Sequence, residues 1–178
     1  MTAEIRWYSE MDDALAAGRR SDKPILLIFF NPWNADCPRM DTVTYPESRV
    51  SQFIRKNFIP LRIRSDSKPY PRKFYIISTP TLIILGPTEM QHHRTTGFFC
   101  PEELIHSLVL GLAKYHFDHS RFDKALVHLE QLEKRPQRQH PENRFPRQSP
   151  PPQANLRPQA VESCRQETEY EFPQQHMG

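Results

Sequence analysis

The sequence contains no long hydrophobic run. None of its apolar stretches approaches the ~20 residues that a helix needs to span a bilayer, and Met1 to Arg6 lack the apolar core of a signal peptide. The chain also lacks a large excess of one charge: it contains 24 Lys and Arg and 21 Asp and Glu, which gives a net charge of +3. We therefore expect a cytoplasmic protein whose partners include neither a membrane nor a nucleic acid.

Cysteine is scarce as well. Cys37, Cys100 and Cys164 are odd in number, and no two have the close spacing of a disulfide scaffold or a zinc site. In a reducing cytosol each is expected to be a free thiol. His92 and His93 are neighbours on an expected strand, so they should point to opposite faces and make a poor metal pair. With no phosphate-binding loop either, the sequence predicts neither a metal nor another cofactor.

Short apolar runs bounded by turn residues are present instead. Residues 25–30 and 81–85 are uninterrupted apolar runs, which is typical of strands buried on both faces. Residues 58–64 alternate between apolar and polar, and Pro60 favours a position at the edge of a sheet. After a turn at 86–89, the polar residues 91–96 are expected to return as an antiparallel strand.

Helical signals separate these strands. Ser9 and Asp12 predict the start of a first helix that ends at Gly18. A second helix begins near Asn34 and is interrupted at Tyr45 and Pro46. Pro101 opens a third helix, whose predicted buried stripe is Leu104, Ile105, Leu108, Val109 and Leu112. A last helix is expected from about Ser120 to Glu133, with the apolar face Phe122, Ala125, Leu126, Leu129 and Leu132.

This order predicts an α/β fold. A strand–helix–strand unit crosses over to parallel pairing, and the following hairpin adds two antiparallel strands. The expected product is a three-layer sandwich, in which helices cover both faces of a mixed four-stranded sheet.

The C-terminal part of the chain differs in composition. The 44 residues from Arg135 to Gly178 hold 8 prolines and 8 glutamines and almost no large aliphatic residues. Such a segment cannot bury enough apolar surface to offset its ordering entropy, so it is predicted to be disordered. The expected organisation is a globular domain over 1–116, a helical extension over 117–134 and a disordered tail over 135–178.

Three local sequences resemble the thioredoxin superfamily. The first is the apolar strand that runs into Trp33 and Cys37, where thioredoxins carry Trp-Cys-x-x-Cys. The second is Thr79-Pro80, which is similar to the cis-proline loop, and the third is Gly97 at the end of the hairpin. The resemblance covers roughly residues 7–115 and is closest to the branch that includes the end domain of the disulfide-transfer protein DsbD. It implies a thioredoxin-like fold. The extension over 117–134 resembles one helix of a tetratricopeptide repeat.

The same alignment implies a degenerate redox motif, Asn34-Ala35-Asp36-Cys37. Cys37 matches the second cysteine, whereas Asn34 stands where the first should be. Dithiol chemistry needs one thiolate to attack and a second thiol to resolve the mixed disulfide, and asparagine cannot attack. Asn34 is instead a good N-cap, because its side-chain carbonyl accepts from open N–H groups. The catalytic candidate is then the single thiol of Cys37. Burial and Asp36 would raise its pKa, whereas Arg39 and the helix N-terminus would lower it, so the sequence leaves its reactivity open.

Two functions follow from this motif. One is the binding of a protein or peptide client without redox turnover. The groove for this client is formed by Trp33, Asn34, Thr79, Pro80, Gly97 and Phe98. A cis-proline would leave backbone groups available there to an extended peptide. The alternative is a thiol-disulfide oxidoreductase that acts through Cys37 alone. The sequence indicates neither the client nor the oligomeric state, and it leaves open whether the protein is an enzyme.

Overall fold

A computed structural model describes residues 4–133 of the chain, and these residues fall within one compact unit. The predicted tail over 135–178 and Cys164 lie outside the described residues. The helices are α1 (Met11–Ser21), α2 (Asp36–Arg39), α3 (Ser48–Asn57), α4 (Tyr70–Lys73), α5 (Pro101–Asp118) and α6 (Phe122–Glu133), and a π-helix, η1, spans Met40–Thr44. The strands are β1 (Ile25–Phe30), β2 (Ile59–Arg64), β3 (Thr81–Leu85) and β4 (Gln91–Thr96). Within 4–133, none of the helices has the length and apolar character needed to cross a bilayer.

The strands form one mixed sheet in the order β2-β1-β3-β4. β1 pairs with β2 in parallel and with β3 in antiparallel orientation, and β3 pairs with β4 in antiparallel orientation. This topology confirms the predicted α/β fold, including the edge position of β2, where the ladder does not need the N–H that Pro60 lacks. The outer edge of β2 makes a single bridge, between Leu61 and Tyr8 of the N-terminal segment.

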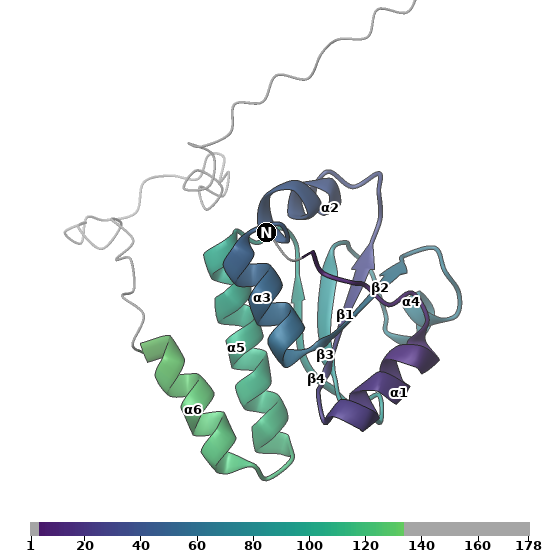
Figure 1. Ribbon diagram of the computed structural model, residues 1–178. Coiled ribbons are helices and arrows are strands. Elements are labelled where there is room, and N and C mark those ends of the chain that lie inside the picture. Colours follow the sequence, from purple (N-terminus) through teal and green to yellow (C-terminus); the bar gives the residue numbers. More distant parts are fainter. Residues whose placement is uncertain (1–3, 134–178) are drawn as a thin grey trace, which may run out of the picture. The chain divides into compact units, whose positions relative to one another are not determined.

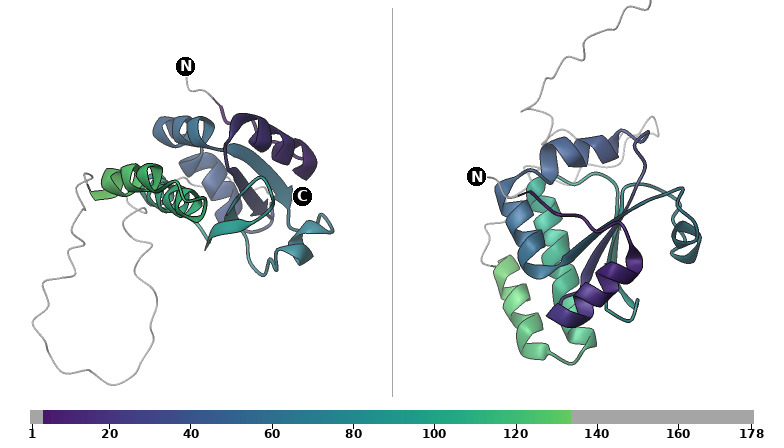
Figure 2. Two further views of the ribbon diagram at one scale, coloured as in Figure 1. Left: turned by 90° about the horizontal axis from the view of Figure 1, so that it is seen from below. Right: turned by 45° about the vertical axis from the view of Figure 1, so that its right-hand side comes forward.

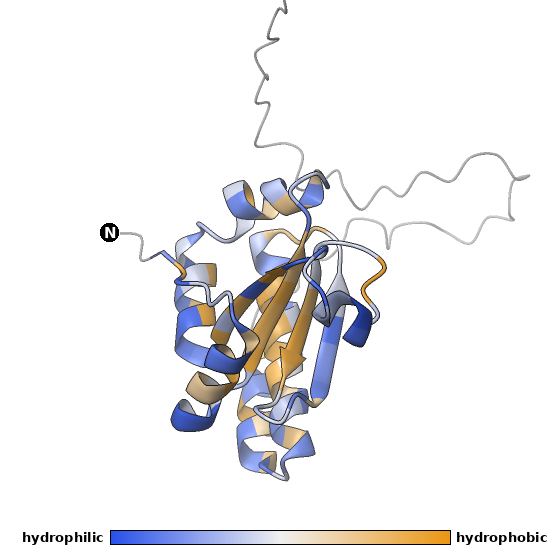
Figure 3. Ribbon diagram, turned by 90° about the vertical axis from the view of Figure 1, so that its right-hand side faces the viewer, coloured by the Kyte–Doolittle hydropathy of each residue, from blue (hydrophilic) through white to orange (hydrophobic). Residues whose placement is uncertain are grey.

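Helices cover both faces of the sheet (Figure 1). Alternate residues of β1 point to opposite faces, so Ile25, Leu27 and Phe29 pack with α1 in one apolar cluster. Leu26 and Ile28 belong to a second cluster with α3 and α5. All five predicted stripe residues of α5 are buried in that second cluster. The β1 and β3 strands are apolar at nearly every position, as the orange centre of Figure 3 shows.

The ends of α1 differ from the prediction. The N-cap is Glu10, whose side chain makes no capping hydrogen bond, and the helix continues past Gly18 to Ser21. Asp22 ends it instead, with a left-handed φ of 53° and its N–H directed to the carbonyl of Gly18. Gly18 is needed for packing, because a Cβ there would lie 3.0 Å from Ile25 Cδ1. The glycine at this position therefore reflects the close approach of α1 to Ile25 rather than the end of the helix.

The expectation that His92 and His93 face opposite sides of β4 is wrong. The register shifts after Ile84, so that His93 lies opposite Ile84 while Gln91 lies opposite Leu85, and His92 is the extra residue of a β-bulge. A bulge breaks the alternation of side chains. Both histidines consequently reach α5: His92 Nδ1 lies 2.7 Å from an Asp118 oxygen, and His93 Nε2 lies 3.0 Å from Ser107 Oγ.

Helix α6 lies beside α5 in all the views of Figures 1 and 2. Its predicted apolar face is only partly correct. Ala125 is buried and Leu132 packs against the core, but the exposed large residues of α6 are Phe122, Leu126, Val127 and Leu129. The buried side is shifted because a histidine takes part in the contact: the rings of His116 on α5 and His128 on α6 are stacked, with centroids 5.4 Å apart and planes 1° from parallel.

This stacked pair makes stability depend on pH. Burial, with the nearby His128, lowers the pKa of His116 to about 4. Between that value and the ordinary pKa near 6.5, the unfolded chain binds more protons than the folded one, so stability falls as the pH is lowered. We expect the free energy of unfolding to fall by about 1 kcal/mol between pH 7 and pH 5 because of His116, a value reduced for solvent screening of a half-exposed ring.

Urea unfolding at the two pH values measures this effect. His93, whose pKa burial also lowers, adds a change of the same sign, so the comparison is between variants. His116→Gln should show a smaller loss between pH 7 and pH 5 than the wild type. His106→Gln, on the exposed side of α5, should lose as much as the wild type. Equal losses in all three proteins would contradict this role of His116.

Candidate functional site

The predicted site residues come from three segments at one end of the sheet. The end of β1, the start of β3 and the end of β4 meet there, because Phe29 lies opposite Thr81 and Thr81 opposite Thr96. Antiparallel pairing thus brings together the segments that follow Phe30, precede Thr81 and follow Thr96, although up to about seventy residues separate them in the sequence.

Asn34 joins two of these segments. Its Oδ1 accepts the N–H of Asp36 at 3.0 Å. The N-cap of α2 is Ala35, so Asn34 lies one residue ahead of the cap position expected from the sequence. Its Nδ2 donates to the backbone carbonyl of Thr79 at 2.6 Å. The second hydrogen bond ties the turn before α2 to the loop before β3. Both functional groups of the Asn34 amide are therefore used in holding the site together.

Cys37 lies inside this turn rather than on its surface. The residue is 2% exposed, and the backbone N–H of Asn31 donates to its Sγ at 3.4 Å. The thiol of Cys37 is free and buried, whereas Cys100 is half-buried. Cys100 is the N-cap of α5, where its N–H donates to Glu103 at 3.0 Å. The Cys37 thiol thus has a structural partner and almost no contact with solvent.

The remaining predicted groove residues are anchored nearby. The Thr79–Pro80 peptide bond is cis, and the carbonyl of Pro80 accepts the N–H of Gly97 at 2.8 Å. The ring of Phe98 is covered by the guanidinium of Arg39, whose central carbon lies 3.8 Å from the ring centroid. The backbone carbonyls of Thr79 and Pro80, which we expected to be available to a peptide, therefore already have partners within the domain.

Exposed apolar side chains flank these anchored residues. Trp33 is 90% exposed, although its backbone N–H donates to Asn31 Oδ1. Tyr75 and Ile77, in the loop that leads to Pro80, are 82% and 98% exposed. Neither Tyr75 nor Ile77 was expected from the sequence to belong to the site. The available signal was an apolar Tyr-Ile-Ile run in a loop whose neighbours are polar, and Tyr75 also has a left-handed φ of 51°.

Groups that would bind a metal are not assembled in the part of the chain that the structure describes. No cluster of three or more His, Cys, Asp or Glu side chains among residues 4–133 is arranged to hold an ion. The site instead offers apolar surface, a buried thiol and a fixed amide.

Comparisons with known proteins agree with the fold. A family model described as thioredoxin-like matches residues 6–87. A thioredoxin from Thermus thermophilus is 22% identical, with 58% of this chain and 83% of the thioredoxin aligned at a TM-score of 0.52. A proposed disulphide-isomerase from Bacteroides thetaiotaomicron is 23% identical, with coverages of 62% and 95% and a TM-score of 0.54. The DsbD C-terminal domain from Neisseria meningitidis, in its oxidised form, is 14% identical, with coverages of 56% and 93% and a TM-score of 0.46. The search of curated proteins found no match.

The two higher-scoring structures share the fold, and the family model covers both the turn of Cys37 and the loop of Pro80. The chain therefore has a thioredoxin-like fold, and residues 6–87 match the family model described as thioredoxin-like.

Proposed function

We propose that this domain binds an extended, apolar segment of a protein client and does not catalyse dithiol–disulfide exchange. The observation that carries the proposal is the position of Asn34. The resemblance places it where thioredoxins carry the attacking cysteine, and both ends of its amide are engaged, to Asp36 and to Thr79. Position 34 thus closes the redox turn onto the proline loop instead of presenting a nucleophile to a substrate.

The mode of recognition follows from which groups remain available. Backbone pairing through the carbonyls of Thr79 and Pro80 is disfavoured, because Asn34 and Gly97 already donate to them. The exposed apolar surface of Trp33, Tyr75 and Ile77 supports side-chain recognition instead. Removing such side chains from water is worth about 25 cal/mol per Å². We infer that the client contributes apolar side chains to this surface.

The alternative function, a single-thiol oxidoreductase acting through Cys37, is less well supported. A thiolate must reach the disulfide that it attacks, and Cys37 is 2% exposed and accepts a hydrogen bond from Asn31. Exchange through Cys37 would require the turn 31–37 to open first. The two functions differ in one simple respect: Cys37→Ala abolishes the second and leaves client binding by the first intact.

A model peptide tests the proposal. The probe is the insulin B chain with its cysteines alkylated, labelled with a fluorophore and followed by fluorescence anisotropy, so that thiol exchange cannot contribute. We expect saturable binding that Trp33→Ser and Ile77→Ser each weaken about tenfold, because one large apolar contact is worth about 1.5 kcal/mol.

Leu126→Ser provides the matched control. Leu126 is also an exposed aliphatic residue, 57% accessible, but it lies on α6. This variant should bind the probe as the wild type does. The proposal fails if the wild-type protein does not bind the probe, or if the variants at positions 33, 77 and 126 all weaken binding equally.

A further inference from the structure

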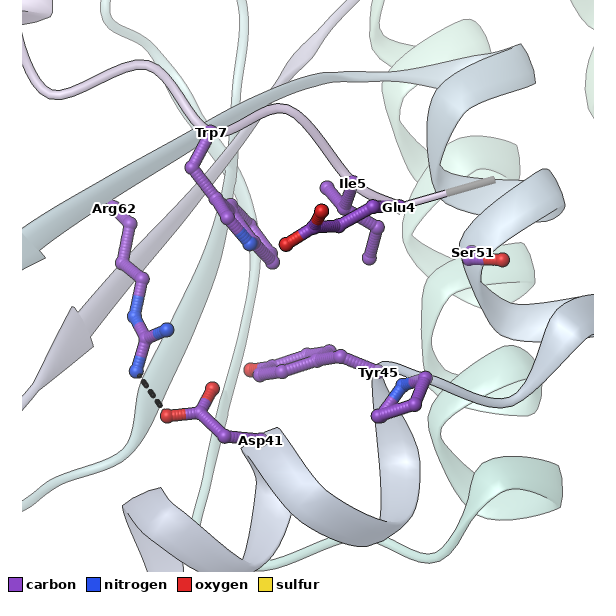
Figure 4. A pocket seen from close by; sticks show the side chains of 8 residues that line it. Glu4, Ile5, Trp7, Asp41, Tyr45, Ser51 and Arg62 are labelled. Carbon is purple, nitrogen blue, oxygen red and sulfur yellow. Dashed lines mark hydrogen bonds and ion pairs between the residues drawn. The ribbon is translucent and has the colours of Figure 1, made fainter. Parts of the chain in front are cut away.

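A cavity lies outside the proposed groove. It has a volume of about 520 Å³ and opens between the N-terminal segment, η1 and β2. The rings of Trp7 and Tyr45 form apolar walls, and their centroids are 5.3 Å apart. Glu4, Asp41 and Arg62 supply its charged groups, as Figure 4 shows. None of the proposed groove residues lines this cavity.

Two hydrogen-bond donors at this cavity have no partner among the described residues. Tyr45 is 7% exposed, and its hydroxyl is buried without a hydrogen bond and directed into the space between the side chains in Figure 4. The Nε of Arg62 is likewise buried and unpartnered. A buried polar group without a partner costs stability, and such groups are few in native proteins. An acceptor oxygen from outside the described residues would satisfy these donors.

The surrounding charges restrict what carries that oxygen. Arg62 already forms an ion pair with Asp41, at 2.7 Å, and Glu4 adds a second carboxylate that faces the same space. Another anion would be repelled by the two carboxylates. A simple cation would satisfy Glu4 but would leave the Tyr45 and Arg62 donors without an acceptor.

We propose that this cavity binds a neutral amide group. The carbonyl oxygen accepts from Tyr45 Oη and Arg62 Nε, the amide N–H donates to Glu4, and the flat group packs against Trp7. A main-chain peptide group and a small carboxamide offer the same chemistry, so both are sources of this ligand. The site is independent of the proposed client groove.

The test uses Trp7 as its reporter. The chain has two tryptophans, so Trp33→Phe leaves Trp7 alone and also removes the main apolar residue of the groove. Benzamide, benzoate and benzylamine are titrated into this protein, and Trp7 fluorescence is recorded. We expect benzamide to bind about tenfold more tightly than either charged analogue. In the same background, Tyr45→Phe should weaken benzamide binding about tenfold, the effect of one hydrogen bond.

Tyr70→Phe is the control, because it removes a hydroxyl from α4, outside the cavity; it should leave benzamide binding unchanged. If Tyr45→Phe does not fold, Arg62→Lys replaces it, since lysine keeps the charge opposite Asp41 but lacks the Nε donor. N-acetylalanine N-methylamide then separates the sources: tighter binding than benzamide assigns a peptide, and weaker binding a small carboxamide. The proposal is overturned if benzoate binds as well as benzamide, or if the pocket variant binds benzamide like the control.

Discussion

Asn34→Cys is expected to gain insulin reductase activity that the wild-type protein lacks. The variant restores two thiols at Cys-x-x-Cys spacing, so that one attacks and the other resolves the mixed disulfide. A cysteine at position 34 would also stand just before α2, where unpaired N–H groups and the helix dipole stabilise a thiolate. In the wild type neither condition holds, because Asn34 is inert and Cys37 is buried.

The turbidity of insulin in dithiothreitol measures this gain. The wild type should give the same rate as dithiothreitol alone, and Asn34→Cys a rate clearly above it. Asn34→Cys combined with Cys37→Ala is the control, since it has the attacking thiol without the resolving one and should not turn over. Substantial turnover by the wild type would contradict our account of Asn34.

The activity of Asn34→Cys should remain below that of an ordinary thioredoxin. Substitution removes the hydrogen bond from Asn34 Nδ2 to the Thr79 carbonyl and the one from the Asp36 N–H to Asn34 Oδ1. Losing one such hydrogen bond costs about 1 kcal/mol. The variant should therefore be less stable than the wild type in its reduced form, which thermal unfolding detects.

The largest loss of stability is expected for Phe29→Ala. Phe29 is 0% exposed at the centre of the sheet, and its ring lies 5.9 Å from that of Phe74. Removing a buried phenylalanine costs about 3–5 kcal/mol, through lost transfer free energy and the cavity left behind. That amount is a large fraction of the total stability of most domains. We expect the urea midpoint to fall steeply, with the variant partly unfolded at 37 °C.

Phe122→Ala makes the same chemical change at the start of α6, where the ring is 53% exposed and touches Phe117. It should cost about 1 kcal/mol or less, because most of that ring remains in water in the folded protein. Comparable losses for Phe29→Ala and Phe122→Ala would mean that the outer side of α6 is covered in solution, in contrast to its exposure in the structure.

The strands could be predicted from the sequence because each is a short run bounded by turn residues. The runs at 25–30 and 81–85 have the observed limits, and Pro60 correctly indicated an edge strand. Both signals are local, and they arise from the backbone geometry of the residues themselves. The fold class followed from the order of these elements, since topology rules leave few arrangements of strand, helix and hairpin.

The parts that could not be predicted depend on contacts between distant residues. The hydrogen bond from Asn34 to Thr79 spans 45 positions and has no local signal. The same is true of the bulge at His92 and of the rotation of α6 by the His116–His128 stack. The exposure of Tyr75 and Ile77 was missed because an apolar residue in a loop more often packs inward than faces solvent.

The bulge in β4 gives the strand a spare residue. If His92 were deleted, Gln91 and His93 would still lie opposite Leu85 and Ile84, and the ladder would continue without interruption. What would be lost is the link from His92 to Asp118 at the last turn of α5. The extra residue thus acts as a tether between the sheet and the point where the chain turns into α6. Deleting His92 would therefore loosen the attachment of the helical extension, while the strands on which the site is built would stay paired.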